Sequence, residues 1–294
     1  TYIASVLAIT DAGLTPVLVD PDPVTLNITA QAISTAINTH SGIKAVMPVH
    51  LYGRVAWDED IRKVVSDNNL LVIEDSAQAI GARSHTDGLY VGHNHAGALG
   101  HAAAFSFYPT KNTGALGDAG AVTTHDKALA DTVRALANYG ADRRYHNIYQ
   151  GYNCRLDPIQ AAMLRVKLPH NDDENRARMQ SARLYDRLIT HPDVIKPLLP
   201  EFEDECIWHQ YVIRVRNGKR DMMRQQLKLA GVDTDIHYEV PPHLQPCYAG
   251  LSHVPLPVTE MTASQLLSLP IARGTDLEDV AAIAEIINNV NLTE

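Results

Sequence analysis

The feature that most constrains the fold is a regular alternation of short apolar runs and amphipathic segments over residues 16–125. The apolar runs predict strands at 16–20, 43–50, 70–77, 102–108 and 120–125, and the amphipathic segments predict helices at 29–38 and 57–69. Continuous apolar strands separated by helices are typical of a mostly parallel sheet that helices cover on both faces. The sequence therefore predicts an α/β fold for this half of the chain.

The second half of the chain has a different pattern, with antiparallel-looking strands and more polar helices. Asp157 as N-cap and Pro158 in the first turn predict the start of one helix, and a long polar helix is expected over 171–190. Further strands are predicted at 208–215 and 234–240, and further helices at 220–231 and 277–290. We therefore expect a large α/β domain over residues 1–165 and a smaller C-terminal α+β domain over residues 166–294.

Composition narrows the class of protein. The 294 residues are 45% hydrophobic and 20% charged, and the net charge of −9 argues against a nucleic-acid partner or an anionic membrane surface. No apolar run approaches a membrane span, no secretory signal is visible, and three widely spaced cysteines indicate neither a disulfide framework nor a zinc finger. We expect a cytoplasmic enzyme. Because the chain opens within a helical pattern, we also expect that upstream residues are absent.

Polar residues stand at the ends of three predicted strands: His50, the pair Glu74 and Asp75, and Ser106. In parallel sheets of this kind, ligands bind beyond the carboxyl ends of the strands. The stretch "FSFYPTKNTGALGDAGAV" (105–122), which contains Ser106, places Lys111 between aromatic residues and a glycine-rich turn. A lysine without a specific function is usually exposed to solvent, so this setting indicates a functional role for Lys111.

Asp75 and Lys111 are both explained if they hold one cofactor. Pyridoxal phosphate requires a lysine for its Schiff base and an acid that faces its pyridinium nitrogen. Ser106 is then a candidate donor to the cofactor phosphate. On spacing alone, Asp75 is explained equally well as a cap for a helix over 76–82, and Lys111 taken alone would be an exposed loop lysine.

Two other groups of polar residues allow alternative readings. His93, His95 and His101 could suggest a metal site, but no fourth ligand or outer shell is evident, so a solvated loop is favoured and no metal is predicted. Arg143 and Arg144 are typical of a solvated face, although arginine can also meet a pyrophosphate through bidentate hydrogen bonds.

Five motifs, in order along essentially the whole chain, resemble those of the DegT/DnrJ/StrS sugar aminotransferases. They are "PVHLYG", "VIEDSAQAIGA", "FSFYPTKNTGALGDAGAV", "GYNCRLDPIQAAML" and "LSLPIARG". The resemblance implies a fold-type I pyridoxal-phosphate-dependent transferase, like aspartate aminotransferase, that acts on nucleotide-linked keto sugars. The form "GALGDAGAV" resembles the branch that makes dTDP-3-amino-3,6-dideoxyhexoses, whereas branches that aminate C4 more often carry a "TTGEGG"-like turn.

The resemblance also implies roles for single residues. Lys111 matches the lysine that forms the Schiff base and carries the proton between cofactor and substrate; relatives with histidine there perform dehydration instead. The implied cofactor-binding residues are Asp75 on the pyridine nitrogen, Gln78 near the ring's O3′, Ser106 on the phosphate, Asn153 on the phosphate of the neighbouring subunit's cofactor, and Tyr2 beside the ring. The role of Asn153 implies an obligate homodimer with shared active sites. The family's phosphate-binding Gly-Thr/Ser helix start would lie upstream of Tyr2 and is absent from this sequence.

Four further residues are candidates for contact with the sugar. Tyr108 precedes Lys111 on the same loop, and His237 and Tyr238 lie beside a proline-stiffened turn that faces the active site in relatives. We expect Tyr108 and His237 to act catalytically and Tyr238 to bind substrate. For His237 and Tyr238 the alternative is a structural strand pair in the small domain. His243 fits a substrate-binding role and a structural role equally well.

The reaction implied by the resemblance is transamination with L-glutamate as amino donor, most specifically of a dTDP-linked 3-keto-6-deoxyhexose. Such amino sugars serve, for example, in lipopolysaccharide O-antigens. One alternative changes the acceptor to a C4-keto UDP- or GDP-sugar or a cyclitol ketone. Another is a non-catalytic, cofactor-bound sensor or regulatory protein, against which the presence of Lys111, Asp75, Ser106 and Asn153 together argues.

Overall fold

The computed structural model describes residues 1–250, 255–272 and 274–292, so Arg273 of the "LSLPIARG" motif lies outside the described residues. Its central sheet has the strand order β1-β2-β3-β4. The strands are β1 (Ala45–Val46), β2 (Leu71–Asp75), β3 (Ala102–Ser106) and β4 (Gly120–Thr124). The first three are parallel and β4 pairs antiparallel with β3. The prediction of a mostly parallel sheet is confirmed, with strands shorter than predicted.

The prediction of a strand over 16–20 is wrong. This segment has no strand partner among the described residues, and Val17 is 38% exposed. Asp20 instead accepts hydrogen bonds from the backbone N–H groups of Val258 and Thr259, at 3.1 and 2.8 Å. The apolar pattern of a strand is therefore present, but the segment serves to hold the first turn of a distant helix.

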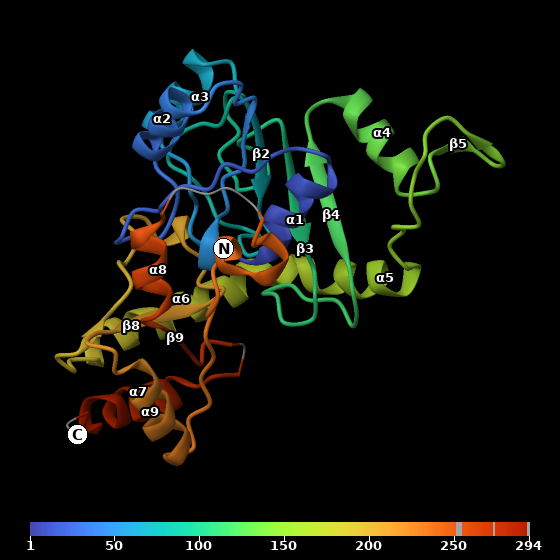
Figure 1. Cartoon of the computed structure of the whole chain (residues 1–294). Coiled ribbons are helices and arrows are strands. Elements are labelled where there is room, and N and C mark those ends of the chain that lie inside the picture. Colours follow the sequence, from blue (N-terminus) through green and yellow to red (C-terminus); the bar gives the residue numbers. More distant parts are fainter. Residues whose placement is uncertain (251–254, 273, 293–294) are drawn as a thin grey trace.

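Helices flank the central sheet (Figure 1). They are α1 (Ile3–Asp11), α2 (Ala30–Thr39), α3 (Glu59–Asp67) and α4 (Lys127–Leu136), and a 3-10 turn, η1 (Leu51–Gly53), follows β1. The starts of α2 and α3 are encoded locally, because Thr29 and Asp58 accept hydrogen bonds from Ala32 N–H and Ile61 N–H. Ile33 and Ile61 pack with β1 and β2 in one buried cluster. None of the described helices is long and apolar enough to cross a membrane.

A hairpin projects from the body of the molecule beyond α4 (Figure 1). Its strands are β5 (Ala141–Arg143) and β6 (His146–Asn147). Tyr145 at its tip is 87% exposed, and Tyr152 farther along is 64% exposed. Exposed aromatic residues on a projecting arm are typical of surfaces that pack against another molecule.

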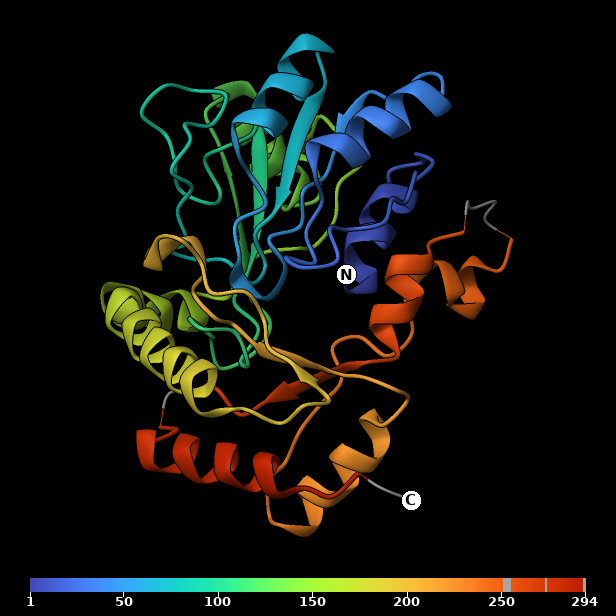
Figure 2. The same ribbon diagram turned by 90° about the vertical axis from the view of Figure 1, so that its left-hand side faces the viewer.

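The C-terminal part holds a second, antiparallel sheet in the order β7-β8-β9, with helices packed against it (Figure 2). Its strands are β7 (Val194–Ile195), β8 (Tyr211–Val215) and β9 (Leu266–Leu269). The helices of this part are α6 (Asn171–Leu188), α7 (Arg220–Leu229), α8 (Pro257–Ala263) and α9 (Leu277–Asn289), and short 3-10 turns occur at Leu168–His170, Glu203–Glu205, Pro242–Leu244 and Pro246–Tyr248. The helix α5 (Pro158–Lys167) comes before them, and its Leu164 packs with Phe107 and Ala115 after β3. The domain boundary at residue 165 stays a prediction.

Two details differ from expectation in this part. The predicted strand at 234–240 does not form, because Asp235 makes a single bridge to Ser268 and the chain then leaves the sheet. The helix α5 begins at Pro158 as predicted, but the side chain of Asp157 makes no capping hydrogen bond.

A backbone ladder ties the two parts of the chain together next to η1. Val55 N–H donates to Glu205 C=O at 2.9 Å, and Ile207 N–H donates to Gly53 C=O at 3.0 Å. Gly53 has φ +92, and a Cβ atom there would meet the backbone of Gln78 and His209 at 3.0 Å. The close approach at Gly53 therefore brings residues from both parts of the chain to one place.

Candidate active site

The carboxylate of Asp75 lies at the carboxyl end of β2 and meets two donors. Its Oδ2 accepts a hydrogen bond of 2.6 Å from the Ser5 hydroxyl on α1, and its Oδ1 accepts one of 3.1 Å from Ala77 N–H. The residues that follow form turns rather than the helix that the capping alternative assumed. Asp75 therefore has one local and one long-range partner, and it stays partly exposed.

The neighbouring carboxylate, Glu74, lies on the opposite face of β2 and is buried with His50. His50 Nε2 lies 3.0 Å from Glu74 Oε2, and both side chains are fully buried. His50 Nδ1 accepts from Ala56 N–H at 3.0 Å, so Nε2 carries the proton that is donated to Glu74. Successive side chains of a strand point to opposite faces, so Glu74 faces the buried side of β2 with His50, and Asp75 faces the other side.

Lys111 lies on the loop after β3, in the electrostatic range of Asp75. Its backbone N–H donates to Tyr108 C=O at 2.8 Å, and its side chain is partly buried. Burial lowers the pKa of Lys111, and the negative charge of Asp75 opposes that change. The structure thus brings together the amine and the carboxylate that the sequence singled out.

The two residues after Lys111 anchor its loop. Asn112 Nδ2 donates to Asn175 Oδ1 on α6 at 3.1 Å, and Thr113 donates to Asn171 Oδ1 at 2.7 Å. Both anchoring side chains are buried. Buried hydrogen bonds directly after Lys111 hold the loop in place and therefore fix the position of its backbone.

His209 is a residue of this region that sequence reasoning missed. Its Nδ1 lies 2.9 Å from Asn112 Oδ1, and its side chain is 9% exposed. Burial lowers its pKa well below 6.5, and the nearby cations Lys111 and Arg178 lower it further. The signal available was a histidine at the start of a predicted buried strand, which alone does not reveal a partner 97 positions away.

Gln78 and Tyr238 meet at the edge of the same site. Gln78 Nε2 donates to the Tyr238 hydroxyl at 3.0 Å, and the Tyr238 ring centroid lies 5.3 Å from that of Tyr2. Burial raises the pKa of Tyr238 to about 12. Two predicted cofactor-binding residues and one predicted substrate-binding residue are therefore neighbours in the structure.

His237 precedes Tyr238 and is held by the C-terminal sheet. Its Nδ1 lies 2.8 Å from Ser268 Oγ on β9, and its backbone carbonyl accepts a hydrogen bond from the Tyr52 hydroxyl. Burial lowers the pKa of His237, with Asp235 opposing and Lys111 adding to that change. A charge interaction with Lys111 places this imidazole near the amine.

Four predicted residues remain, and each has different surroundings. Ser106 closes β3, and its hydroxyl accepts from Tyr108 N–H at 3.3 Å; Tyr108 is 50% exposed. Asn153 is exposed and makes a backbone bridge to Asn138 at the base of the arm. His243 is buried, with Nε2 3.1 Å from Glu260 on α8. The roles of these four residues, like those of the other predicted site residues, stay predictions.

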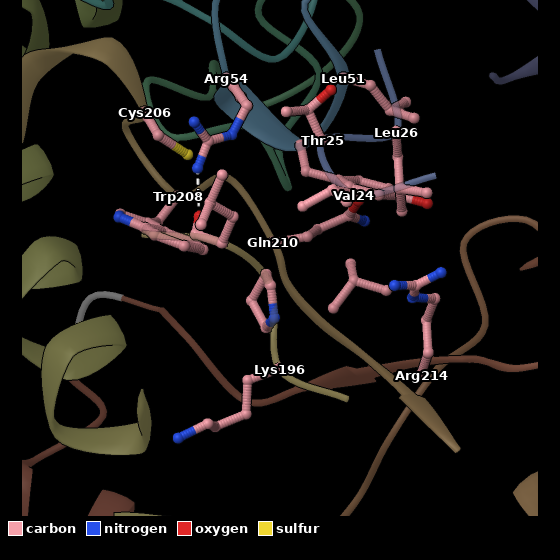
Figure 3. A pocket seen from close by; sticks show the side chains of 14 residues that line it. Val24, Thr25, Leu26, Leu51, Arg54, Lys196, Cys206, Trp208, Gln210 and Arg214 are labelled. Atoms are coloured by element: carbon pink, nitrogen blue, oxygen red, sulfur yellow. Dashed lines mark hydrogen bonds between the residues drawn. The ribbon is translucent and has the colours of Figure 1, made fainter. Parts of the chain in front are cut away.

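Neither a metal centre nor a second sugar-sized site accompanies this group at the two features described next. Among the described residues no group of three His, Cys, Asp or Glu side chains is arranged to hold a metal ion. A separate pocket lies between residues 24–26 and β8 and is lined by Arg54, Trp208 and Arg214 (Figure 3). Its cavity volume is about 30 Å³, which is room for about two water molecules and not for a sugar.

The donor set around Lys111 fits pyridoxal phosphate. The site offers a partly buried amine with a lowered pKa, a carboxylate at a strand end and a hydroxyl at the neighbouring strand end. These are the groups that the cofactor's aldehyde, ring nitrogen and phosphate require. Fold and site together define the class as a fold-type I pyridoxal-phosphate-dependent transferase, and the solved structures with the same fold agree.

The chain belongs to the DegT/DnrJ/EryC1/StrS aminotransferase family, whose model matches residues 1–288. A dTDP-3-amino-3,6-dideoxy-alpha-D-galactopyranose transaminase from Aneurinibacillus thermoaerophilus is 42% identical over 98% of this chain and 76% of its own length. The erythromycin biosynthesis sensory transduction protein EryC1 from Saccharopolyspora erythraea is 44% identical, over 92% of this chain and 72% of its own length.

Among solved structures, S. venezuelae DesV in complex with a ketimine intermediate has a TM-score of 0.89 at 38% identity, and the match covers 98% of this chain and 75% of that chain. The predictions of the family, the fold type, the cofactor and a nucleotide-sugar aminotransferase activity are confirmed.

Proposed function

We propose that this aminotransferase moves the amino group of L-glutamate to a dTDP-linked 3-keto-6-deoxyhexose, giving the dTDP-3-amino-3,6-dideoxyhexose. The observation that carries the choice of sugar is the "GALGDAGAV" turn after Lys111, which resembles the branch that aminates C3. The relative from A. thermoaerophilus, named for a dTDP-3-amino-3,6-dideoxy sugar, supports the same choice.

In this proposal Lys111 is the group that moves protons at the reacting carbon. Bound pyridoxal phosphate supplies an electron sink. Burial lowers the pKa of Lys111, which favours the neutral amine that can accept a proton at Nζ. Asp75 would hold the protonated ring nitrogen, and Ser106 would donate to the phosphate. Gln78 and Tyr2 would orient the ring, with Tyr108 and His237 on the sugar side.

The active unit in this proposal is a cytoplasmic homodimer. Asn153 is exposed at the base of the projecting arm, and the exposed Tyr145 and Tyr152 lie on the same stretch. If the arm packs on a second copy, burial of these aromatic side chains stabilises the dimer and Asn153 can reach the partner's phosphate site.

The test of the proposal is a panel of nucleotide-linked keto sugars. The protein loaded with pyridoxal phosphate is mixed with glutamate, and conversion to the pyridoxamine form is followed by loss of the visible absorption band. Recovery of the band is then measured with dTDP-3-keto, UDP-4-keto and GDP-4-keto sugars and with a cyclitol ketone. We expect recovery to be fastest with the dTDP-3-keto sugar.

Relatives named for UDP- and GDP-linked sugars make the alternatives concrete. A UDP-2-acetamido-2-deoxy-3-oxo-D-glucuronate aminotransferase from Pseudomonas aeruginosa is 36% identical over 98% of this chain and 77% of its own length. A GDP-perosamine synthase from Caulobacter vibrioides is 34% identical over 99% of this chain and 77% of its own length. Faster recovery with a UDP- or GDP-sugar would overturn the choice of dTDP, and absence of recovery with every acceptor would favour the regulatory alternative.

A further inference from the structure

The amide of Gln78 has a single orientation that its neighbours dictate. Its Oε1 lies 2.6 Å from the backbone N–H of Tyr52, a group that can only donate. The atom facing Tyr52 must therefore be the oxygen, and the NH₂ group must face the other way.

The NH₂ group of Gln78 lies 3.0 Å from the hydroxyl of Tyr238. Because an amide NH₂ can only donate, the Tyr238 oxygen is the acceptor, and its own hydrogen must point elsewhere. In the part of the chain that the structure describes, no acceptor takes this hydrogen. Since burial raises the pKa of Tyr238 to about 12, the hydrogen is present at neutral pH.

Tyr52 supports this arrangement through both its backbone N–H and its side-chain hydroxyl. Its N–H orients Gln78, and its hydroxyl donates to the backbone carbonyl of His237, directly before Tyr238. Tyr52 has φ +59, in the left-handed region that non-glycine residues adopt at a cost, and its ring packs against the C-terminal core. A strained backbone held by contacts on both sides is typical of a residue that positions others.

We propose that Tyr52 and Gln78 are positioning residues that make the Tyr238 hydroxyl a hydrogen-bond donor to an oxygen atom of the ligand bound at Lys111 and Asp75. The acceptor is an anionic or carbonyl oxygen, a chemistry that the ring hydroxyl of the cofactor and the keto group of the sugar share. The inference rests on the proposed function only for the identity of the sugar. In this arrangement Gln78 donates and the Tyr238 hydroxyl accepts. A substitution at Gln78 can exchange these two roles.

The reversing substitution is Gln78→Glu. A carboxylate at this position still accepts from Tyr52 N–H, but it also accepts from Tyr238, whose hydrogen is then withdrawn from the ligand. Tyr238→Phe removes the hydroxyl altogether. Tyr90→Phe, at a ring that packs against His125 outside the site, is the matched control.

The direct readout is the Tyr238 ring carbon that bears the hydroxyl, observed by NMR in protein with ¹³Cζ-labelled tyrosine and assigned by its loss in Tyr238→Phe. We expect the wild-type signal to shift when ligand binds, because its hydroxyl gains an acceptor. In Gln78→Glu the signal should be displaced before any ligand is added and should move less on binding. The wild-type titration needs only the assignment variant, so it stands even if Gln78→Glu folds poorly.

Two titrations distinguish the acceptors. Pyridoxal phosphate is added to cofactor-free protein, and the nucleotide keto sugar is added to protein that carries pyridoxamine phosphate. A shift with the first ligand assigns the acceptor to the cofactor, and a shift only with the second assigns it to the sugar. The first titration does not involve the sugar, so its result is independent of the keto-sugar panel.

Ligand affinity provides the second readout. We expect Gln78→Glu and Tyr238→Phe each to weaken binding of the responding ligand about tenfold, which corresponds to one neutral hydrogen bond. The double variant should lose no more than either single variant, because both remove the same hydrogen bond. A wild-type Tyr238 signal that is indifferent to both ligands would overturn the proposal, and so would additive losses in the double variant.

Discussion

Glu74 and Asp75 are adjacent carboxylates at the end of one strand, and the structure gives them opposite surroundings. Glu74 is fully buried, and His50 and the backbone N–H groups of Gly97, Leu99 and Gly100 surround it. Asp75 is partly exposed, with one hydroxyl and one N–H as partners and with Lys111 in electrostatic range. A saturated carboxylate has no remaining capacity for a ligand, whereas Asp75 has lone pairs left to offer. The comparison indicates that Glu74 stabilises the fold and that Asp75 is available to bind a ligand.

The largest effect is expected on activity at Asp75. Asp75→Asn keeps the size of the side chain but removes the charge that a protonated ring nitrogen needs. We expect transamination to fall by about 10²–10⁴-fold, with the thermal unfolding midpoint little changed. Asp60→Asn, on the exposed start of α3, is the control. Equal losses of activity in Asp75→Asn and Asp60→Asn would break the comparison.

The opposite result is expected at Glu74. Glu74→Gln leaves His50 without its carboxylate and turns an amide NH₂ toward buried donors, so it should lower the free energy of unfolding by about 3–5 kcal/mol. Urea titration measures the loss, and Glu59→Gln, at an exposed pair with Arg62, should change the free energy of unfolding far less than Glu74→Gln does. Activity per folded molecule should persist. A stable Glu74→Gln protein without activity would reverse the assignment of the two acids.

The loss of stability at acid pH provides a further test of the difference between Glu74 and Asp75. Burial raises the pKa of Glu74, but hydrogen bonds from His50, Gly100 and Gly97 outweigh burial and bring it below 4.5. Its contribution to stability is therefore complete above pH 4.5 and disappears as the pH falls through its lower folded pKa. Glu74→Gln should lack this part of the acid transition.

A smaller effect is expected at His209. Its folded pKa lies well below 6.5, so between the two values the unfolded chain binds a proton that the folded chain does not. Stability therefore rises with pH in this window, by up to about 1.4 kcal/mol per pH unit for one group. His209→Gln should flatten the slope of unfolding free energy against pH, as measured by urea titration at several pH values. An unchanged slope in His209→Gln would show that His209 is not held neutral.

The smallest effect is a change in the titration of Lys111. Asp75 raises the pKa of Lys111 against the lowering by burial, so removal of the carboxylate should lower that pKa further. In cofactor-free Asp75→Asn, acylation of Lys111, followed by mass spectrometry, should begin at lower pH than in the wild type. A shift to higher pH would contradict the proximity of the two groups.

The parts of the fold that the sequence predicted correctly are those with local causes. The helices α2 and α3 begin where Thr29 and Asp58 cap them, and the β2 and β3 strands follow their apolar runs. The segments 16–20 and 234–240 have the same strand-like composition but no ladder, since pairing depends on a neighbour supplied by the tertiary structure. The local apolar pattern of the sequence predicts which segments can form strands, but it cannot predict whether a neighbouring strand is present to pair with them.

The site was predictable to the same degree. Asp75 and Lys111 follow from their places at strand ends and from the motifs, and the structure brings them together. The period of two along β2 assigns Glu74 and Asp75 to opposite faces of the sheet, so this difference is also encoded in the sequence. The contact between Asn112 and His209 could not be predicted from the sequence, because the two residues are 97 positions apart and only the tertiary structure brings them together.

The central claim is that Lys111 is the amine that reacts with the cofactor, and borohydride trapping tests it most directly. Protein mixed with pyridoxal phosphate is reduced, digested and analysed by mass spectrometry for the lysine that carries the pyridoxyl group. We predict one dominant label, on Lys111, and its loss in Lys111→Ala. A dominant label on another lysine, such as Lys167 whose amine donates to Gly114 C=O, or undiminished labelling of Lys111→Ala, would contradict the account.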